Sequence, residues 1–259
     1  MKRSHATPAV MLIGALFTAS AIANASLTGK KGLIVVTNHG QLGNTGKPTG
    51  YFLSEVTHPY WKLVEAGMTV DFVSPEGGAA PMDPSSRDLS DPDNRRFVED
   101  GSLSKRLEAT LTPSQIDPSQ YSAIIYAGGH GTMWDFADDT ELAKLAAQVY
   151  ERGGVVAAVC HGPSGLLNVK LSDGTYLVNG RKLAAFTNSE EAAVGLTKVV
   201  PFMLETSLTD RGATGVTALD FTKNVQVDGR LVTGQNPASA SELGAEVVRL
   251  LSAQLQTGK

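Results

Sequence analysis

The stretch Gly153-Gly-Val-Val-Ala-Ala-Val-Cys160-His-Gly-Pro-Ser-Gly165 contains the only cysteine of the 259 residues. Its Val- and Ala-rich part, residues 155–159, predicts a short strand buried on both faces. The small residues that follow predict a sharp turn into a helix from Ser164 to about Val169. A side chain at such a turn projects from the carboxyl edge of a parallel sheet, beside the first free N–H groups of the helix. We therefore expect Cys160 to be exposed and its thiol pKa to be lowered, as in a nucleophile.

Strand-like and helix-like segments alternate along the rest of the chain. The predicted strands cover residues 32–37, 68–73, 122–127, 155–159 and 182–186. The predicted helices cover residues 57–65, 138–151, parts of 190–211, and a last segment from the cap at 236 to about 255. Such alternation predicts an open, mostly parallel sheet with helices on both faces. Ligands bind such sheets outside the carboxyl ends of the strands.

Three local features refine this prediction. Pro59 interrupts a helical apolar pattern, so we expect the regular helix to begin only near Thr57. Residues 75–121 are rich in Pro, Asp, Ser and Gly, which predicts a surface excursion with a short helix near 102–111. Residues 224–233 predict a hairpin turned at Asp228-Gly229.

The first 25 residues have the pattern of a secretory signal peptide. Lys2 and Arg3 precede an apolar stretch at 9–22, which ends in Ala23-Asn24-Ala25. This stretch is shorter than the roughly 20 residues of a membrane span. We therefore predict cleavage after Ala25 and a single exported domain at 26–259, which in a bacterium is periplasmic.

Charge and cysteine content narrow the possible functions. Residues 1–25 carry two of the 22 basic side chains and none of the 26 acidic ones, so the mature chain has a formal charge of −6. Because no basic run stands out, we expect neither nucleic acid nor a membrane surface as a partner. A single cysteine cannot form an intramolecular disulfide. Cys160 is therefore either a buried, inert residue or a free thiol with a function.

Two further strand ends and one acidic residue are candidates for the same site. Residues 128–132, Gly-Gly-His-Gly-Thr, follow the third strand, where glycines let backbone N–H groups approach a ligand, although a tight turn would need the same residues. Glu190 and Glu191 follow the fifth strand and equally suit a solvated first helical turn. Glu55 lies in an apolar neighbourhood, where spacing alone favours a solvated or paired carboxylate.

Taken together, these segments resemble the DJ-1/PfpI superfamily, and within it the Hsp31-like glutathione-independent glyoxalases with a class I glutamine amidotransferase-like fold. The resemblance is carried by Gly50–Tyr60, Val70–Pro75, Ala127–Thr132, Gly153–Pro163 and Gly229–Ala238. The Ala-Val-Cys-His-Gly-Pro and Gly-Gly-His-Gly-Thr motifs are its most specific parts. It implies a flavodoxin-like three-layer α/β sandwich with a mostly parallel central sheet, commonly assembled as a homodimer.

The resemblance also assigns catalytic roles. It makes Cys160 the nucleophile, His161 its neighbouring base, and Glu55 the carboxylate that contacts the thiol. The third member of the Cys-His-acid arrangement falls on Glu191, with the adjacent Glu190 as the alternative.

The same resemblance implies a substrate-binding loop and a reaction. The backbone N–H groups of Gly129 and His161 would form the oxyanion site, in a loop shaped by Gly128 and His130. The thiolate would add to a 2-oxoaldehyde such as methylglyoxal. An enediol and a lactate thioester would follow, and water would release the acid. Whether His161 or Glu55 moves the proton is left open.

No metal or organic cofactor is expected. The histidines of the mature chain are His39, His58, His130 and His161, and no two of them have the helical i, i+4 spacing of a metal site. Three other functions stay open beside the glyoxalase: a holding chaperone, a Cys-His-Glu hydrolase or amidase, and a thiol redox sensor.

Overall fold

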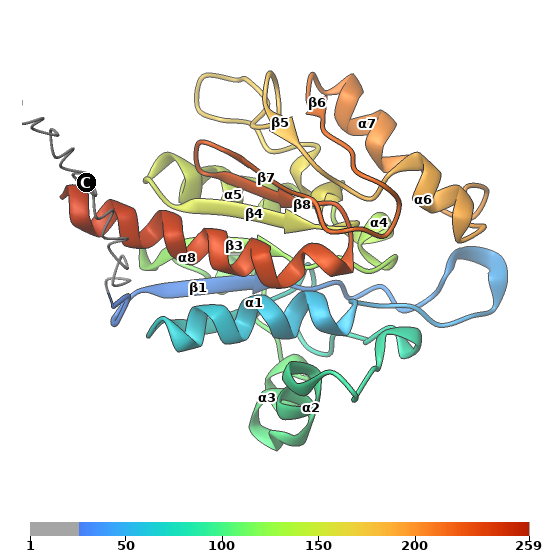
Figure 1. The fold of residues 1–259 in the computed structure, drawn as a ribbon, viewed down its shortest axis with the longest axis horizontal. Coiled ribbons are helices and arrows are strands. Elements are labelled where there is room, and N and C mark those ends of the chain that lie inside the picture. Colours follow the sequence, from blue (N-terminus) through green and yellow to red (C-terminus); the bar gives the residue numbers. More distant parts are fainter. Residues whose placement is uncertain (1–25, 259) are drawn as a thin grey trace, which may run out of the picture.

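The central sheet has six strands in the order β2-β1-β3-β4-β8-β7 (Figure 1). We describe residues 26–258 from a computed structural model, so the predicted signal peptide lies outside the described residues. The strands of this sheet are β1 (Lys31–Val35), β2 (Thr69–Val73), β3 (Tyr121–Tyr126), β4 (Val155–Val159), β7 (Val225–Asp228) and β8 (Leu231–Gly234). All neighbours pair in parallel except β7 with β8. The predicted mostly parallel α/β sheet is confirmed.

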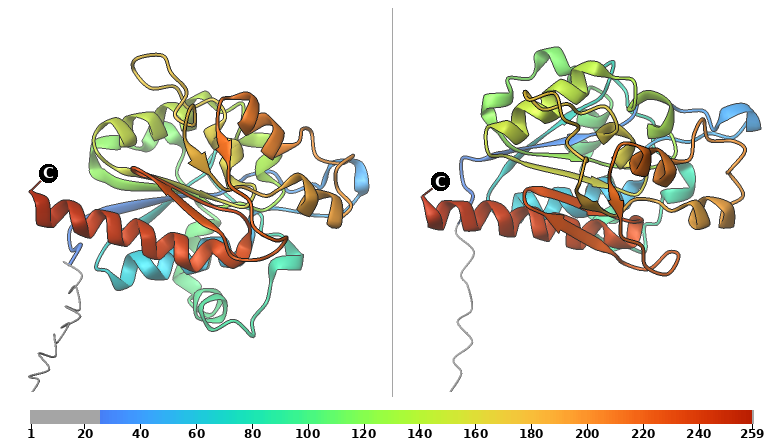
Figure 2. Two further views of the ribbon diagram at one scale, coloured as in Figure 1. Left: turned by 45° about the horizontal axis from the view of Figure 1, so that its top comes forward. Right: turned by 90° about the horizontal axis from the view of Figure 1, so that it is seen from above.

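Helices cover both faces of this sheet. The described residues form the helices α1 (Leu53–Glu65), α2 (Pro92–Glu99), α3 (Gly101–Leu107), α4 (Thr132–Asp135), α5 (Thr140–Glu151), α6 (Asn188–Ala193), α7 (Leu204–Asp210) and α8 (Ala240–Thr257), of which α1, α5 and α8 cover the sheet. Figure 2 shows α1 and α8 side by side on one face and α5 on the other. Within residues 26–258, no helix combines the length and the apolar character needed to cross a bilayer.

Alternating side chains of the strands pack into two separate hydrophobic cores, one on each face of the sheet. In β1, Leu33 and Val35 belong to the core beneath α5, whereas Ile34 belongs to the core beneath α1 and α8. All five residues of β4, Val-Val-Ala-Ala-Val, are buried. A strand with helices on both faces must be apolar on both, which explains the unbroken Val-Ala run. This strand ends at Cys160, in the middle of the sheet.

The first helix differs from its prediction. α1 begins at Leu53, not near Thr57, and Pro59 lies inside it. A proline removes one backbone hydrogen bond and disfavours a helix interior by about 3 kcal/mol. Nine of the 13 residues of α1 are buried, and this burial outweighs the loss. The earlier start matters because it places Glu55 in the first turn, under the sheet edge.

The excursion at 75–121 contains two helices where the sequence predicted one. α2 begins at Pro92 and is capped by Asp91, whose carboxylate accepts hydrogen bonds from the N–H groups of Asp93 and Asn94. The sequence Asp91-Pro92 is typical of a helix start, with Asp as the cap and Pro as the first residue. α3 ends at Leu107, four residues before the predicted end.

The predicted fifth strand is not part of the main sheet. Only Lys182–Leu183 (β5) is extended, and it pairs in parallel with β6 (Thr214–Gly215) in a separate two-stranded sheet. The position beside β4 is taken by β8, the second strand of the predicted hairpin, whose two turn residues are Gly229 and Arg230. The segment after β5 still reaches the site, because the Phe186 N–H donates to the Cys160 carbonyl (2.9 Å).

Candidate active site

Cys160 lies at the turn that follows β4, in a backbone conformation that is rare for a residue with a side chain. Its φ is 59°, in the left-handed region. Its N–H donates to the Gly234 carbonyl (2.9 Å) and its own carbonyl accepts from Phe186, so neighbouring segments hold the turn on both sides. A buried 3-10 helix, Gly162–Leu166, replaces the predicted helix 164–169. The geometry aims the sulfur away from the strand, at the carboxyl edge of the sheet.

The predicted exposed thiol of low pKa is wrong on both counts. Cys160 is only 3% exposed. Burial, and then the neighbouring Glu55 carboxyl, raise the pKa of its thiol well above the ordinary value. The short 3-10 helix stabilises a thiolate less than the dipole of the predicted α-helix would. This stabilisation does not offset the unfavourable burial of a charged sulfur.

His161 connects the sulfur to an acidic residue. Its Nδ1 lies 3.3 Å from Sγ of Cys160, and its Nε2 lies 2.7 Å from Oε2 of Glu191. The carboxylate partner assigns the proton to Nε2 and leaves Nδ1 free to accept the thiol proton. Burial lowers the pKa of His161 to about 4, with a further contribution from His130. At neutral pH the imidazole is therefore an uncharged base.

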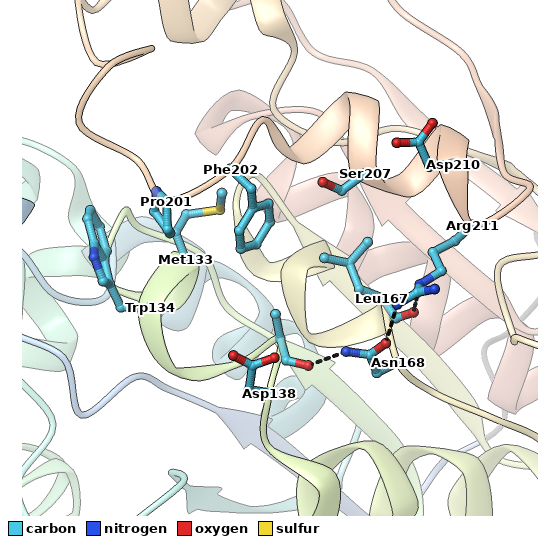
Figure 3. Close-up of a pocket in the computed structure, with 11 residues that line it drawn as sticks. Met133, Trp134, Asp138, Leu167, Asn168, Pro201, Phe202, Ser207, Asp210 and Arg211 are labelled. Carbon is cyan, nitrogen blue, oxygen red and sulfur yellow. Dashed lines mark hydrogen bonds between the residues drawn. The ribbon is translucent and has the colours of Figure 1, made fainter.

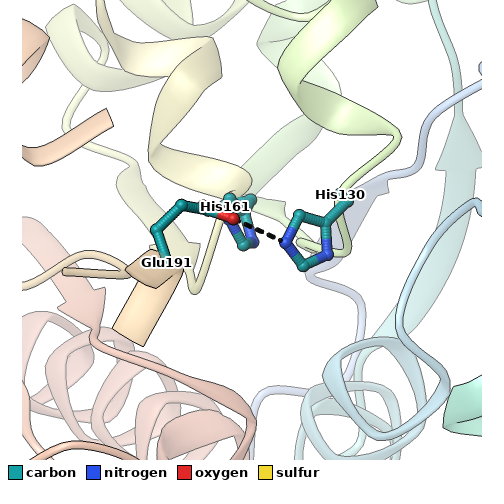
Figure 4. Close-up of side chains that lie close together, drawn as sticks. All are labelled: His130, His161 and Glu191. Atoms are coloured by element: carbon teal, nitrogen blue, oxygen red, sulfur yellow. Dashed lines mark hydrogen bonds and ion pairs between the residues drawn. The ribbon is translucent and has the colours of Figure 1, made fainter. Parts of the chain in front are cut away.

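Glu191 accepts hydrogen bonds from two histidines. Its Oε1 lies 3.1 Å from Nε2 of His130, and the rings of His130 and His161 are 4.1 Å apart (Figure 4). Burial would raise the pKa of this carboxyl, but the hydrogen bonds from His130 and His161 outweigh it and hold the pKa at about 2. Glu191 is therefore ionised. His130 does more than shape its loop, because it fixes the second oxygen of this carboxylate.

The alternative acid, Glu190, points elsewhere. It is fully buried, and its Oε1 accepts hydrogen bonds from Phe221 N–H (2.7 Å), Asn236 Nδ2 (2.8 Å) and Gln235 Nε2 (3.1 Å). Its Oε2 accepts from the N–H of Thr187 (2.9 Å), in a capping box at the start of α6. The structure thus places Glu191, and not Glu190, against His161.

Glu55 approaches the sulfur from α1. It is fully buried, and its Oε2 accepts a hydrogen bond from the Gly128 N–H (2.8 Å). Its Oε1 has no nitrogen or oxygen partner among residues 26–258. Burial raises the pKa of Glu55 to about 8, against the opposing effects of hydrogen bonds with the Cys160 thiol and the Gly128 N–H. At neutral pH this carboxyl is therefore mainly protonated and able to donate.

The Gly-Gly-His loop brings backbone donors to the same point. Hydrogen bonding by the N–H groups of His161 and Gly129 opposes the rise of the Cys160 pKa, so both donors face the sulfur. Gly128 must lack a side chain, because a Cβ there would lie 2.5 Å from Oε2 of Glu55. Gly129 has a φ of 99°, which favours glycine. The structure thus gathers every residue that the sequence assigned to the site.

A cavity of about 530 Å³ opens onto the sulfur. Cys160, His161, Gly129 and His130 form its floor. Its walls are mainly apolar and are formed by residues that the sequence analysis did not select: Leu42, Pro48, Phe52, Pro84, Phe186, Val194, Leu196, Phe221 and Pro237. They come from separate segments, and no local pattern connects them. Their common feature is position after a strand or at a helix end, which the sheet-edge rule alone could have indicated.

A second cavity, of about 460 Å³, lies between α4 and α7 (Figure 3). Two of its polar side chains bind each other and the backbone: the Arg211 guanidinium donates to Asn168 Oδ1 (2.8 Å) and to the Leu167 carbonyl (3.1 Å), and Asn168 Nδ2 donates to the Ala137 carbonyl (2.7 Å). No cysteine or histidine lines it. The cavity at Cys160 is therefore the better candidate for an active site.

His130, His161 and Glu191 also form a group of the kind that binds metal ions. One ligand-type atom from each lies within 4.8 Å of the others (Figure 4). Sequence spacing could not reveal this group, because its members come from three separate segments. In the structure the two Nε2 atoms donate to the carboxylate. A metal ion would have to displace both of these protons.

A cysteine, histidine and glutamate at the carboxyl edge of a parallel sheet, beside two N–H donors, define a class of nucleophilic-cysteine proteins. The chain belongs to the DJ-1/PfpI family, which residues 49–250 match.

Similar proteins extend along most of the chain. The glutathione-independent glyoxalase HSP31 of Saccharomyces cerevisiae is 34% identical over 82% of this chain and 93% of its own length. Glyoxalase 3 of Candida albicans is 30% identical over 84% of this chain and 97% of its own length. Among solved structures, the Rapid Encystment Protein 24 KDa of Francisella tularensis has a TM-score of 0.83 and 38% identity over 86% of this chain and 99% of its own. Glyoxalase III of Candida albicans has a TM-score of 0.79 and 28% identity over 85% and 97%.

Proposed function

We propose that this chain is a glutathione-independent glyoxalase, which converts methylglyoxal and related 2-oxoaldehydes to 2-hydroxy acids. The observation that carries the proposal is the environment of the Cys160 sulfur. An uncharged imidazole, a protonated carboxyl and two backbone N–H groups all face it. Relatives named as glyoxalases support the same assignment.

The first step joins the sulfur to the aldehyde carbon. As the C–S bond forms, the thiol proton moves from Sγ to Nδ1 of His161 and then to the aldehyde oxygen. The N–H groups of Gly129 and His161 stabilise that oxygen while it carries negative charge. Because the proton leaves as the bond forms, the reaction needs no resting thiolate, which the raised pKa of Cys160 would disfavour. The product is a hemithioacetal.

The second step moves a hydrogen between the two carbons. His161 takes the hydrogen of the former aldehyde carbon as a proton, and the electron pair forms an enediolate with the former ketone carbon. Protonated Glu55 then gives its proton to that second carbon, while the hydroxyl proton of the first carbon passes to the second oxygen. One carbon is oxidised and the other reduced, so no external oxidant is needed. Water then hydrolyses the resulting thioester. Ionised Glu55 takes a proton from the attacking water, and protonated His161 gives its proton to the departing sulfur of Cys160, so lactic acid leaves and all three groups return to their starting protonation states.

The finer assignments are also proposals. We propose a D-lactate dehydratase type of lyase activity, an exported and periplasmic location that follows from the signal-like residues 1–25, and assembly as a homodimer. The charge of the mature chain supports partners that are neither nucleic acid nor membrane.

A hydrolase or amidase is the alternative that the same residues support best. Cys160, His161 and Glu191 have the order of contacts found in cysteine hydrolases, in which the thiolate attacks a carbonyl. The position of Glu55 favours the glyoxalase. Acyl transfer by such a triad does not require a second, protonated carboxyl next to the sulfur, whereas the glyoxalase reaction uses it as a proton donor.

The test is lactate formation from methylglyoxal without glutathione, using the mature chain with its thiol confirmed as reduced. We expect lactate from the wild type, none from Cys160→Ala, and a rate lowered about 100-fold or more in Glu55→Gln, because the amide cannot transfer a proton. Absence of lactate from the reduced wild type, with hydrolysis of a thioester or amide in its place, would favour the hydrolase.

A further inference from the structure

The cavity above Cys160 is larger than methylglyoxal needs. Its volume of about 530 Å³ falls within the roughly 300–1,000 Å³ of pockets that hold drug-sized ligands. Methylglyoxal carries one methyl group beyond its two carbonyls and would leave most of this space filled with water. Contact between apolar side chains and water is unfavourable. A ligand with an apolar group that displaces this water would therefore bind more tightly.

Two aromatic side chains of the cavity lining lie beside each other, and one of them packs against His161. Phe186 packs against the His161 ring, with 4.3 Å between centroids, and Phe221 lies next to Phe186 at 6.3 Å. Val194 and Leu196, from the end of α6 and the segment after it, line the same cavity. Phe221 is 49% exposed and Val194 43% exposed, so both apolar side chains are partly open to solvent at the cavity.

The cavity lining offers little to a charged substrate. Its carboxylate, Asp83, already accepts hydrogen bonds from Thr49 Oγ1 (2.9 Å) and from Ser85 N–H (2.8 Å). The only cation among the lining residues, Lys47, is exposed to solvent. The cavity therefore recognises the body of a ligand by apolar contact and its reacting carbonyls by the polar floor.

The backbone holds Phe221 at the mouth of the cavity at an energetic cost. Its φ is 57°, in the left-handed region that residues with side chains rarely adopt. Its N–H donates to Oε1 of Glu190 (2.7 Å), and Glu190 is itself fixed by Asn236 Nδ2 (2.8 Å). Strained residues persist where the surroundings hold them, and they cluster at functional sites. The buried Glu190, which has no part in the Cys-His-Glu arrangement, thus positions the loop that carries Phe221.

We propose that the site takes 2-oxoaldehydes with a bulky apolar substituent, such as an aryl group, and that Phe221 is a specificity-determining residue. The inference rests on the proposed glyoxalase function. The substituent lies against Phe221 and Phe186, while the aldehyde carbon meets Sγ of Cys160 at the cavity floor.

The experiment measures kcat/KM for phenylglyoxal and methylglyoxal without glutathione, in the wild type, Phe221→Ala and Leu219→Ala. Cys160→Ala provides the blank for non-enzymatic loss of either aldehyde. Leu219 is the matched control, since it belongs to the same loop, is 81% exposed and does not line the cavity. We expect the wild type to prefer phenylglyoxal. Phe221→Ala should lower kcat/KM for phenylglyoxal about ten-fold or more relative to that for methylglyoxal, and Leu219→Ala should leave both unchanged.

A second variant, Phe221→Gly, separates the ring from the backbone strain. Glycine adopts the left-handed conformation freely, so the loop stays in place while the ring is lost. We expect the same loss of phenylglyoxal preference as in Phe221→Ala. Turnover of methylglyoxal with no preference for phenylglyoxal, or equal losses for both aldehydes in the two Phe221 variants, would overturn the inference and leave the proposed function intact. Turnover of neither aldehyde by the wild type would overturn the function itself.

Discussion

Glu191 accepts a hydrogen bond from Nε2 of His161 at 2.7 Å, on the side of the imidazole ring that faces away from Cys160. This contact decides which nitrogen carries the proton. With Nε2 protonated, Nδ1 presents a lone pair to the sulfur 3.3 Å away. The acid thus acts on the reaction through the histidine, and it does not touch the substrate.

Replacing Glu191 should therefore impair turnover more than folding. In Glu191→Gln the side-chain amide can donate to Nε2 and favour the wrong tautomer of His161. We expect kcat to fall about 100- to 10,000-fold, as in other Cys- or Ser-His-acid arrangements. The measurement is steady-state kinetics with methylglyoxal beside a denaturant unfolding curve.

Glu190→Gln is the matched control, because the residue is adjacent and equally buried. It weakens hydrogen bonds to Phe221, Gln235 and Asn236, so we expect a loss of about 1–3 kcal/mol in the free energy of unfolding. Turnover of methylglyoxal by the folded variant should stay within a few-fold of the wild type. The reverse pattern, with activity lost only in Glu190→Gln, would contradict the assignment of Glu191.

The pH dependence of kcat/KM should reflect the shifted pKa values of His161 and Glu55. Activity requires neutral His161, whose pKa is lowered to about 4, and protonated Glu55, whose pKa is raised to about 8. We therefore expect a plateau that declines as pH falls toward 4 and as it rises through about 8. The residual activity of Glu55→Gln should lack the alkaline decline. A wild-type rate that increases through pH 8 would instead make ionised Glu55 the base.

Glu55 should also make stability depend on pH. Its folded pKa of about 8 exceeds the ordinary value of 4.5, so between these values the folded chain binds more protons than the unfolded chain. Its contribution to stability is therefore complete below about pH 4.5 and is lost as pH rises through 8. The glutamine side chain of Glu55→Gln does not ionise, so this contribution does not change with pH in the variant. The unfolding midpoint of Glu55→Gln should therefore increase relative to that of the wild type as pH rises. A gap that is constant between pH 5 and 8 would show that Glu55 ionises normally in the folded state.

The turn at Cys160 predicts an unusual order of stability among substitutions. At a φ of 59°, alanine retains the steric cost of a Cβ and glycine does not. We expect Cys160→Gly to unfold at higher denaturant concentration than Cys160→Ala, by about 1 kcal/mol in free energy. Equal or reversed stabilities would indicate that the left-handed turn relaxes once the sulfur is removed.

Local patterns in the sequence predicted the sheet and the helices on both faces because β4 and its neighbours are buried on both faces, and this burial requires apolar runs that are easy to recognise. The start of α1 was missed since proline disfavours a helix locally, whereas the burial that overrides it comes from α8 and the sheet. The same limit explains β5: which strand lies beside β4 is decided by tertiary competition, and β8 occupies that place.

At the site, residue types and their resemblance to a known family predicted that Cys160, His161, Glu55 and the glycine loop lie together. They did not predict the pKa values of these groups. The pKa of the thiol depends on its burial and on Glu55, which is 105 positions away in the sequence. The choice between Glu190 and Glu191 likewise depended on which side chain faces His161. The apolar cavity wall, with Phe221, comes from segments that no motif links.

The central claim is that Cys160 forms a covalent bond with the substrate. The most direct measurement is mass spectrometry of protein quenched in acid during turnover of methylglyoxal, using the slow Glu55→Gln variant so that intermediates accumulate. We expect the peptide containing Cys160 to gain the mass of one methylglyoxal, and Cys160→Ala to show no such adduct. Lactate production without any adduct on Cys160, or undiminished in Cys160→Ala, would contradict the central claim.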